Sequence, residues 1–171
     1  KEKKYDESAS VLLTLLKFLE TQDRLYIIKN YISVALSDSY IKNGDHDKAI
    51  SILKSLNNIY PNDNAILYYL SDALIKNKEY REVINKLIPY VIEHKDHMLV
   101  IKISEAAYKL KEKSLGHEYR GDYLKMLGSL NSAIKYYKLA LKYNMKGETI
   151  DKRIMSKIKE IEKLKENKEI L

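Results

Sequence analysis

Histidines with carboxylates beside them are the residues of this chain whose types and spacing could do chemistry. His94 and His97 lie three residues apart in the segment HKDH, with Asp96 between them, and could supply part of a metal site. A protein metal site needs a third ligand and supporting hydrogen bonds. The segment also falls between two predicted helices, where polar residues are common. We therefore expect no metal site there.

A second pair, His117 and Glu118, begins the segment GHEYRGDYLKMLG. Metalloproteases carry His-Glu-x-x-His on a helix, but Gly121 stands where the second histidine would be needed. The chain has no cysteine, so thiol nucleophiles and disulfides are excluded. It also lacks a glycine-rich phosphate loop and a Gly-x-Ser-x-Gly motif. The sequence therefore predicts a non-catalytic protein without a metal or cofactor.

Composition favours an all-α protein. Of 171 residues, 45% are hydrophobic and 32% charged, whereas glycine and proline number only 5 and 2, too few for many hairpins. The net charge of +7 comes mainly from lysines spread along the chain, which argues against a nucleic-acid surface. No apolar run approaches 18 residues, so no membrane span is expected.

Apolar residues at helical spacing predict about nine helices separated by short joints. Gly44 should end the second helix, and the Asp45 side chain should cap the third by accepting from its free N–H groups. Pro61 should end the third helix, and Asn62 or Asp63 should cap the fourth. The predicted helices span 5–19, 23–42, 47–60, 64–77, 80–93, 97–111, 116–127, 130–143 and 149–166.

The chain also repeats itself. LSDSYIKNGDHDKAI, from Leu36, and LSDALIKNKEYREVI, from Leu70, are identical at seven of fifteen positions and lie 34 residues apart. GDYLKMLGSLNSAIKYYKLAL, from Gly121, is a weaker third match. Helix–turn–helix units of this length resemble the tetratricopeptide repeat. The resemblance implies a right-handed α-solenoid, in which each helix pair packs on the next.

We expect one repeat domain over residues 1–171, as a fragment of a longer protein. Val83 and Ala133, which hold equivalent places, are 50 residues apart rather than 34 or 68, so one extra helix shifts the register. The seventh helix should then pair with both of its neighbours. The expected parts are 1–20 (second helix of a truncated repeat), 30–63 and 64–97 (repeats), 98–147 (irregular repeats with a phase shift) and 148–171 (capping helix).

The resemblance also implies a binding groove, because the first helices of tetratricopeptide pairs line a concave surface. Its exposed positions correspond here to Val34, Asp38, Lys42, Tyr68, Asp72, Lys76, Glu118, Asp122 and Met126. Aspartate recurs at the middle position of each unit and would repel a peptide carboxylate, so we expect no clamp for an acidic C-terminus. An alternative stays open: Asp38 with Lys42, and Asp72 with Lys76, could be solvated i, i+4 pairs without a ligand.

A narrower resemblance covers residues 117–164, which look like the C-terminal segment of BepA-type zinc metallopeptidases. Those bacterial envelope enzymes join an N-terminal protease domain to a C-terminal repeat domain. The matching positions are His117-Glu118, Asp122-Tyr123, Gly128, Ala133-Ile134 and Arg153-Ile154, while Gly121 replaces the usual alanine. The resemblance implies a periplasmic domain that docks the protease and recruits outer-membrane assembly components or their stalled clients. No zinc or catalytic residue carries over.

The expected function is therefore a protein–protein interaction scaffold with a protein or peptide ligand in its groove. In the leading version it is the accessory domain of an envelope metallopeptidase, with the protease domain in the same polypeptide. One alternative is a free-standing cytoplasmic adaptor for extended peptides. Another is an assembly module that self-associates through the end left open by the missing half-repeat.

Overall fold

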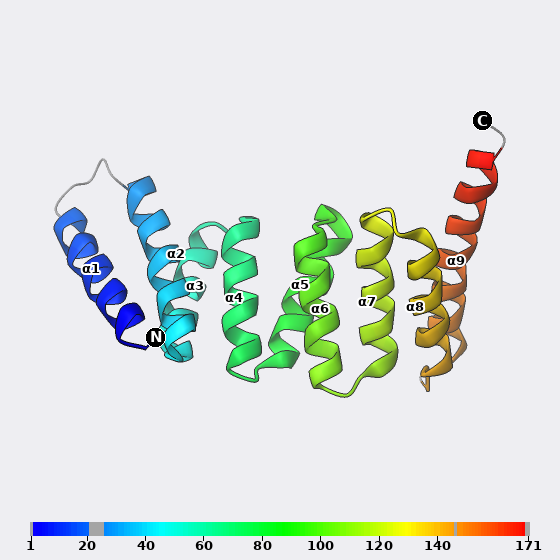
Figure 1. Ribbon diagram of the computed structural model, residues 1–171, viewed down its shortest axis with the longest axis horizontal. Helices are drawn as coiled ribbons and strands as arrows, with labels where there is room; N and C mark the ends of the chain where they lie inside the picture. Colours follow the sequence, from blue (N-terminus) through cyan, green and yellow to red (C-terminus); the bar gives the residue numbers. More distant parts are fainter. Residues whose placement is uncertain (1, 21–25, 146, 170–171) are drawn as a thin grey trace. The chain divides into compact units, whose positions relative to one another are not determined.

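The computed structural model describes residues 2–20, 26–145 and 147–169. Over these ranges the chain forms nine helices and no strand, which confirms the predicted all-α class (Figure 1). None of the described helices is both long and apolar enough to cross a membrane. The helices are α1 (Glu2–Glu20), α2 (Tyr26–Asn43), α3 (His46–Ile59), α4 (Asn64–Lys76), α5 (Tyr80–His94), α6 (His97–Lys109), α7 (Lys113–Met126), α8 (Leu130–Lys142) and α9 (Glu148–Glu169).

The chain divides into two compact units, one up to residue 79 and one from residue 80. In unit 1, α2 packs against α1, α3 and α4, and α3 also packs against α4. In unit 2, each helix from α5 to α9 packs against the next. α7 therefore contacts both α6 and α8, as expected of the seventh helix. The solenoid and the single repeat domain stay predictions.

The two matching segments of the sequence have the same structural roles. Leu36 and Leu70 are both buried in the core of unit 1. The buried serines that follow them donate to a carbonyl one turn back, Ser37 to Ser33 at 2.8 Å and Ser71 to Leu67 at 2.7 Å. A serine bonded in this way needs no outside partner and is small enough for helices to approach closely. The repetition in the sequence is therefore a repetition of packing.

One helix-ending turn occurs four times. A residue with positive φ follows α2, α4, α6 and α7: Gly44 (91°), Lys78 (65°), Lys111 (61°) and Gly128 (76°). In each case the next residue donates its N–H to a carbonyl five residues back, at 2.8–2.9 Å. These bonds satisfy carbonyls at the helix end. The turns lie 34, 33 and 17 residues apart, so the last interval is about half of each of the first two.

Polar side chains repeat at the first two of these turns as well. Asn43, at the end of α2, donates to Asp6 of α1 at 2.6 Å. Asn77, which follows α4 at the equivalent place, donates to Asp47 of α3 at 3.0 Å and to Glu79 at 2.7 Å. The asparagine in each repeat thus joins its own helix to the preceding one.

The start of α7 and the capping of α3 differ from the prediction. α7 begins at Lys113 rather than at residue 116, because the turn at Lys111 closes early and leaves Glu112 at the N-cap. The side chain of Asp45 makes no cap bond, contrary to prediction; Asn43 and Lys48 bind it instead. The predicted start of the second helix, at residue 23, lies outside the described residues.

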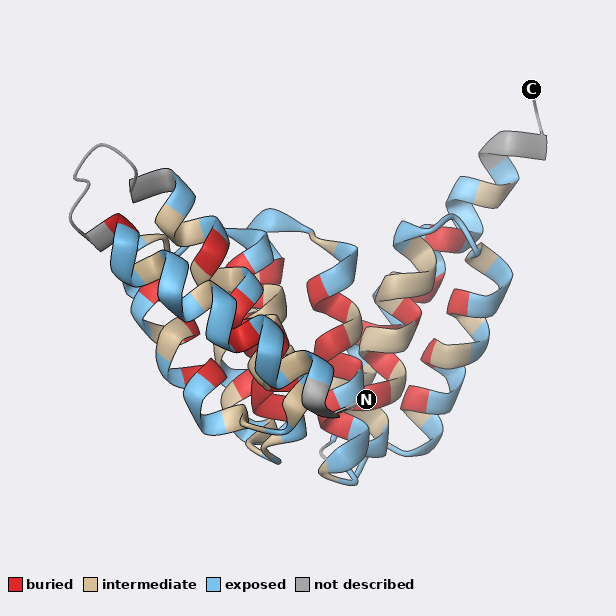
Figure 2. Cartoon of the chain, turned by 60° about the vertical axis from the view of Figure 1, so that its left-hand side comes forward, coloured by how far each residue is buried: buried red, intermediate tan, exposed pale blue. Residues whose placement is uncertain are grey.

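One hydrophobic cluster of unit 2 lies between α8 and α9. Three isoleucines of α9 are buried against α8, as the apolar stripe of a capping helix predicted. Tyr137 is fully buried at the centre, and its ring packs on Gly121 of α7 so closely that a Cβ there would lie 2.5 Å from the ring. Buried residues lie where helices of one unit face each other, and exposed residues lie outside (Figure 2). This cluster consists of Ala133, Tyr137, Ala140, Ile154, Ile158 and Ile161.

Candidate functional site

A hollow of about 550 Å³ lies on α2 and α4 in unit 1, the first helices of two predicted pairs. Val34 and Asp38, two of the predicted groove residues, line it. Lys42, Tyr68, Asp72 and Lys76 are on the same helices but are not among its walls. We call this hollow the unit 1 groove, and its lining consists of Asn30, Tyr31, Val34, Ala35, Asp38, Tyr60, Asp63, Ala65, Ile66 and Tyr69.

The unit 1 groove offers apolar surface with hydroxyl groups at its edge. The side chain of Tyr31 is 75% exposed, and that of Ala35 is also exposed. Tyr60 is held in place because its hydroxyl accepts a hydrogen bond of 2.8 Å from the Asn30 amide. The ring of Tyr69 packs edge-to-face on that of Tyr68, with centroids 5.7 Å apart. Tyrosines fixed in this way give contact area without much loss of side-chain entropy on binding.

Charged groups of the unit 1 groove already have partners. Lys42 bonds to Asp38, and this hydrogen bond and its charge raise the pKa of Lys42. Asp63 accepts from the first free N–H groups of α4, at Ala65 and Ile66, which confirms one of the two predicted caps. Lys76 likewise pairs with Asp72 at 3.0 Å. Exposed i, i+4 pairs contribute only about 0.3–0.5 kcal/mol each, so a ligand meets little net charge here.

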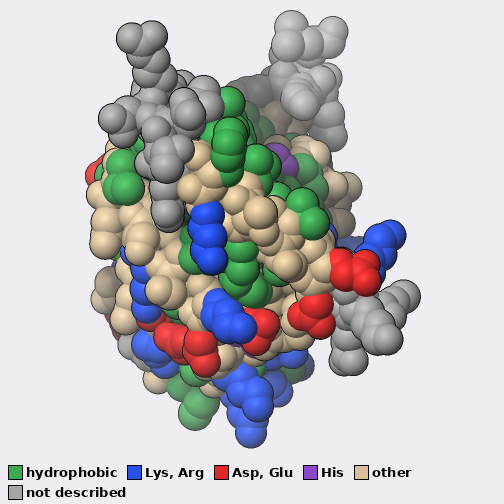
Figure 3. Space-filling model, turned by 90° about the vertical axis from the view of Figure 1, so that its left-hand side faces the viewer, with side chains coloured by type: hydrophobic (Ala, Val, Ile, Leu, Met, Phe, Trp, Pro, Cys, Tyr) green, Lys and Arg blue, Asp and Glu red, His purple; other side chains and the backbone are tan. Residues whose placement is uncertain are grey.

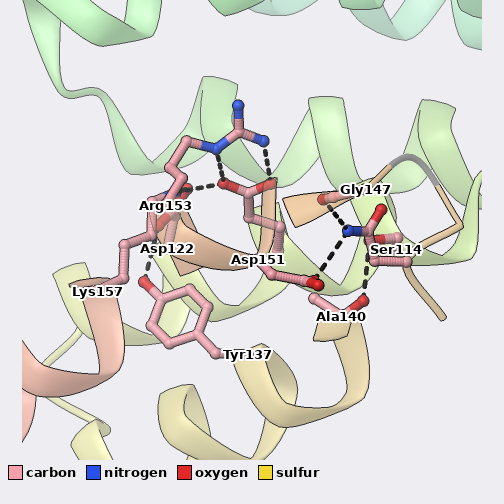
Figure 4. Close-up of polar contacts among 10 residues, drawn as sticks. Ser114, Asp122, Tyr137, Ala140, Gly147, Asp151, Arg153 and Lys157 are labelled. Carbon is pink, nitrogen blue, oxygen red and sulfur yellow. Dashed lines mark hydrogen bonds and ion pairs between the residues drawn. The ribbon is translucent and has the colours of Figure 1, made fainter. Parts of the chain in front are cut away.

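The third set of predicted groove residues lies in a different environment, on α7 in unit 2. Glu118 was expected to be exposed, but its side chain is only 2% exposed. Arg153 of α9 donates to it from Nε at 2.9 Å and from Nη2 at 2.6 Å, and Lys157 donates at 2.8 Å. Arg153 and Lys157 of α9 thus reach this part of α7 with their side chains (Figure 4). Met126, one helical turn beyond Asp122, is 40% exposed.

Asp122 belongs to the same cluster. Lys157 donates to its carboxylate at 2.7 Å, and the hydroxyl of buried Tyr137 also donates to it at 2.7 Å. The α7–α9 cluster, as we call Glu118, Asp122, Tyr137, Arg153 and Lys157, holds two carboxylates and two cations. Both carboxylates are bonded within the cluster, so its evident role is to fix α9 on α7.

Protonation in the α7–α9 cluster follows from burial and charge. Burial acts to raise the pKa of Glu118, but Lys157 and Arg153 outweigh it and hold the pKa below its usual value. The hydrogen bonds that Arg153 donates to Glu118 raise the pKa of Arg153 in turn. Burial, together with the charge of Asp122, raises the pKa of Tyr137. Glu118 and Arg153 are therefore charged at neutral pH, and Tyr137 is neutral.

Histidines and the acids near them serve local structure. Asp96 caps α6 by accepting from Met98 N at 2.7 Å and Leu99 N at 3.1 Å. His94 lies against the ring of Tyr90, with centroids 4.3 Å apart. Across the described ranges, no three His, Asp or Glu side chains are close enough to hold a metal ion.

The predicted groove positions did not include Tyr31, Ile66 and Tyr69, which line the unit 1 groove. The 34-residue interval relates Val34 to Tyr68 and Ala35 to Tyr69. Two pairs of positions that lie 34 residues apart line the groove together, Tyr31 with Ala65 and Ala35 with Tyr69. The α4 equivalents of Val34 and Asp38 do not line it. The repeat therefore relates the two walls, but the predicted positions were only partly the lining ones.

The sequence matches no protein-family model, and it has no significant match among curated proteins. Relationships to tetratricopeptide repeat proteins and to BepA-type metallopeptidases therefore remain predictions. They rest on the residues that carry the two resemblances.

Proposed function

We propose that this chain is a non-catalytic protein-interaction scaffold built from stacked helix pairs, and that the unit 1 groove binds a peptide. The observation that carries this proposal is the groove itself, about 550 Å³ with a 75%-exposed tyrosine at its wall. The fourfold turn and the equal roles of Leu36 and Leu70 support the stacked pairs. Stacked pairs in turn make α2 and α4 neighbouring first helices that line one surface.

Peptide binding in this groove would depend on apolar contact. Burying one aliphatic side chain of valine or leucine size contributes about 1.5–3 kcal/mol, and tyrosines such as Tyr31 and Tyr69 are common among residues that dominate interface energies. Because Asp38 and Asp63 are already bonded, a charged ligand would gain little from them. The favoured ligand is therefore an extended segment with apolar anchors, whose affinity changes little with salt concentration.

Selection from a random peptide library tests this proposal. We expect peptides rich in Leu, Ile or Phe, with affinities that fall at least tenfold in Tyr31→Ala and in Val34→Asp. Ile59→Ala is the matched control, because Ile59 is 65% exposed on α3 of the same unit but does not line the groove. Peptides that bind all variants equally, or bind only through an acidic C-terminus, would show that the groove is not the site.

The biological setting we propose is that of an accessory domain in a periplasmic envelope metallopeptidase. Residues that carry this resemblance meet in the structure, since Glu118 pairs with Arg153, and Ala133 and Ile154 share one core. The matching segment is thus one packing unit. The full reading frame tests this setting: an export signal and His-Glu-x-x-His upstream support it, while a start codon near residue 1 without a signal favours a cytoplasmic adaptor.

Self-association is the second candidate, and the surface of α1 favours it. Val11 and Phe18 are each 66% exposed, and Leu13 and Leu15 are 39% and 41% exposed. Hydrophobic side chains are visible among charged ones on the α1 side of the molecule (Figure 3). Sedimentation tests this candidate, which predicts dimers that dissociate in Val11→Lys. A monomer at several hundred micromolar would exclude it.

A further inference from the structure

A hollow in unit 2, separate from the unit 1 groove, has aromatic walls and an arginine. It is formed by α6, α7 and α8 and measures about 500 Å³. We call it the Arg120 hollow. Its lining consists of Ile101, Ser104, Glu105, Tyr108, His117, Arg120, Tyr136 and Leu139.

We infer that the Arg120 hollow binds a peptide segment in which an acidic residue adjoins an apolar one, with the carboxylate on Arg120 and the apolar side chain against the rings. The ligand class follows from the arginine, from the local charge and from the walls of the hollow.

Arg120 is held in position without an anionic partner. Its guanidinium lies 5.3 Å from the ring centroid of Tyr123 and 6.0 Å from that of Tyr136. Arg81 and Arg153 each pair with a glutamate at 2.6 Å, whereas no carboxylate in the described part of the chain forms an ion pair with Arg120. A guanidinium stacked on rings keeps its planar edge of N–H donors for a carboxylate, which it can bind bidentately.

The charges around the hollow favour an anion. Lys113 of α7 lies outside the lining, over the ring of Tyr143 at 5.1 Å from its centroid, but its charge acts on His117 in the wall. Glu105 is the one acid among the lining residues, and Lys102 lies 3.8 Å from its carboxylate. Arg120 and Lys113 therefore leave a positive balance at the hollow.

The ring walls of the hollow are fixed before any ligand arrives. The ring of Tyr108 packs on Gly116, where a Cβ would lie 2.7 Å from the ring, so α6 and α7 approach closely. Ser104 reinforces this contact by donating to Gly116 O at 2.8 Å. The Tyr108 hydroxyl also lies 2.7 Å from Nδ1 of His117. Preformed walls lower the entropy cost of binding.

The same rings present an uncharged surface at neutral pH. Burial raises the pKa of Tyr108 to about 12. Burial, together with the charge of Lys113, lowers the pKa of His117 below its usual value. Neutral aromatic faces suit an apolar or aromatic side chain, and the combination of Arg and Tyr is typical of interface hot spots. The walls therefore account for the apolar half of the ligand.

Nuclear magnetic resonance with arginine-labelled full chain tests this inference. The probe is acetyl-Phe-Asp-Phe-amide, compared with acetyl-Phe-Asn-Phe-amide and with inorganic phosphate. We expect the Arg120 Nε–H signal to shift saturably with the aspartate peptide and at least tenfold more weakly with the asparagine peptide. Equal shifts with both peptides, no saturable shift, or saturation by phosphate but not by the peptide would overturn the inference.

Substitutions of Arg120 distinguish the contribution of the planar guanidinium geometry from that of the positive charge. Arg120→Lys keeps the charge but loses the planar edge, so we expect the affinity for the aspartate peptide to fall by about tenfold. Arg120→Gln also removes the charge and should abolish binding. In both variants, binding is followed by the chemical shifts of His117. Arg81→Gln is the control, because Arg81 is already paired with Glu112, and binding should be unchanged. Unchanged binding by Arg120→Gln, with the fold intact by circular dichroism, would refute the assignment. Tyr31→Ala, which disables the unit 1 groove, should leave this site intact.

Discussion

Glu118 of α7 and Arg153 of α9 form a bidentate ion pair, with N–O distances of 2.9 and 2.6 Å. The glutamate is buried, whereas the arginine side chain is 53% exposed. A half-exposed arginine can be solvated when its partner is removed, but a buried carboxylate that loses its partners cannot. The pair is therefore asymmetric. Loss of the Glu118 carboxylate should destabilise the packing of α9 more than loss of either cation alone.

Replacing the glutamate should loosen α9. We expect Glu118→Gln to lower the free energy of unfolding by about 1–3 kcal/mol, because Lys157 and Arg153 lose a charged acceptor. Urea denaturation followed by circular dichroism measures the change. Glu148→Gln is the control, since its side chain is 88% exposed and pairs with the exposed Lys152 at 3.4 Å. Equal effects of the two substitutions would contradict a structural role for the buried pair.

Lowering the pH should reduce the stability of the folded protein through protonation of Glu118. The pKa of Glu118 is lowered in the folded state from its ordinary value of 4.5. The unfolded chain thus takes up a proton more readily, and the stability that Glu118 contributes is present above pH 4.5 and lost as the pH falls through its folded pKa. The free energy of unfolding, measured between pH 3 and 6, should fall less steeply toward acid in Glu118→Gln. Identical slopes would show that Glu118 titrates alike in both states.

Gly121 should tolerate no side chain. A Cβ would lie 2.5 Å from the ring of Tyr137, which is fully buried and bonded through its hydroxyl to Asp122. Such overpacking costs about 1–3 kcal/mol, so Gly121→Ala should lower the unfolding midpoint. Ser132→Ala, at an exposed position on α8, should not. Pairing Gly121→Ala with Tyr137→Leu should restore part of the loss, and strictly additive losses would argue against the contact.

Replacing Lys78 by glycine should stabilise the folded protein. It follows α4 with a φ of 65°, where Gly44 follows α2 in the equivalent turn. Glycine adopts positive φ without the steric cost of a Cβ, so Lys78→Gly should raise the free energy of unfolding by about 0.5–1 kcal/mol. Lys86→Gly, inside α5, should lower it by a similar amount. A destabilised Lys78→Gly would mean that this turn does not follow the pattern.

Local signals let the sequence predict the helices well. Periodicity, Gly44, Pro61 and Asp63 act within a few residues, and the predicted ends of α3, α4 and α8 differ from the structure by one residue. The start of α7 was missed because lysine at position 111 takes the positive φ that glycine usually marks. The sequence does not reveal such a turn when a residue other than glycine adopts the left-handed conformation.

Long-range packing was harder to predict. Glu118 sits at a position equivalent to Val34, and nothing within α7 shows that α9 will cover it. Its burial depends on Arg153 and Lys157, which lie 35 and 39 residues further on. The 34-residue repeat predicted that α2 and α4 would supply the unit 1 groove, but only Val34 and Asp38 of the predicted positions line it.

Photo-crosslinking from the unit 1 groove tests the proposed function most directly. A benzophenone amino acid at position 69, in the groove wall, or at position 59, outside it, would be activated with a library-selected peptide present. We predict a crosslink from position 69 that unlabelled peptide suppresses and that Tyr31→Ala removes, and none from position 59. Crosslinking from position 59 alone, or from neither position although the peptide binds, would contradict the account.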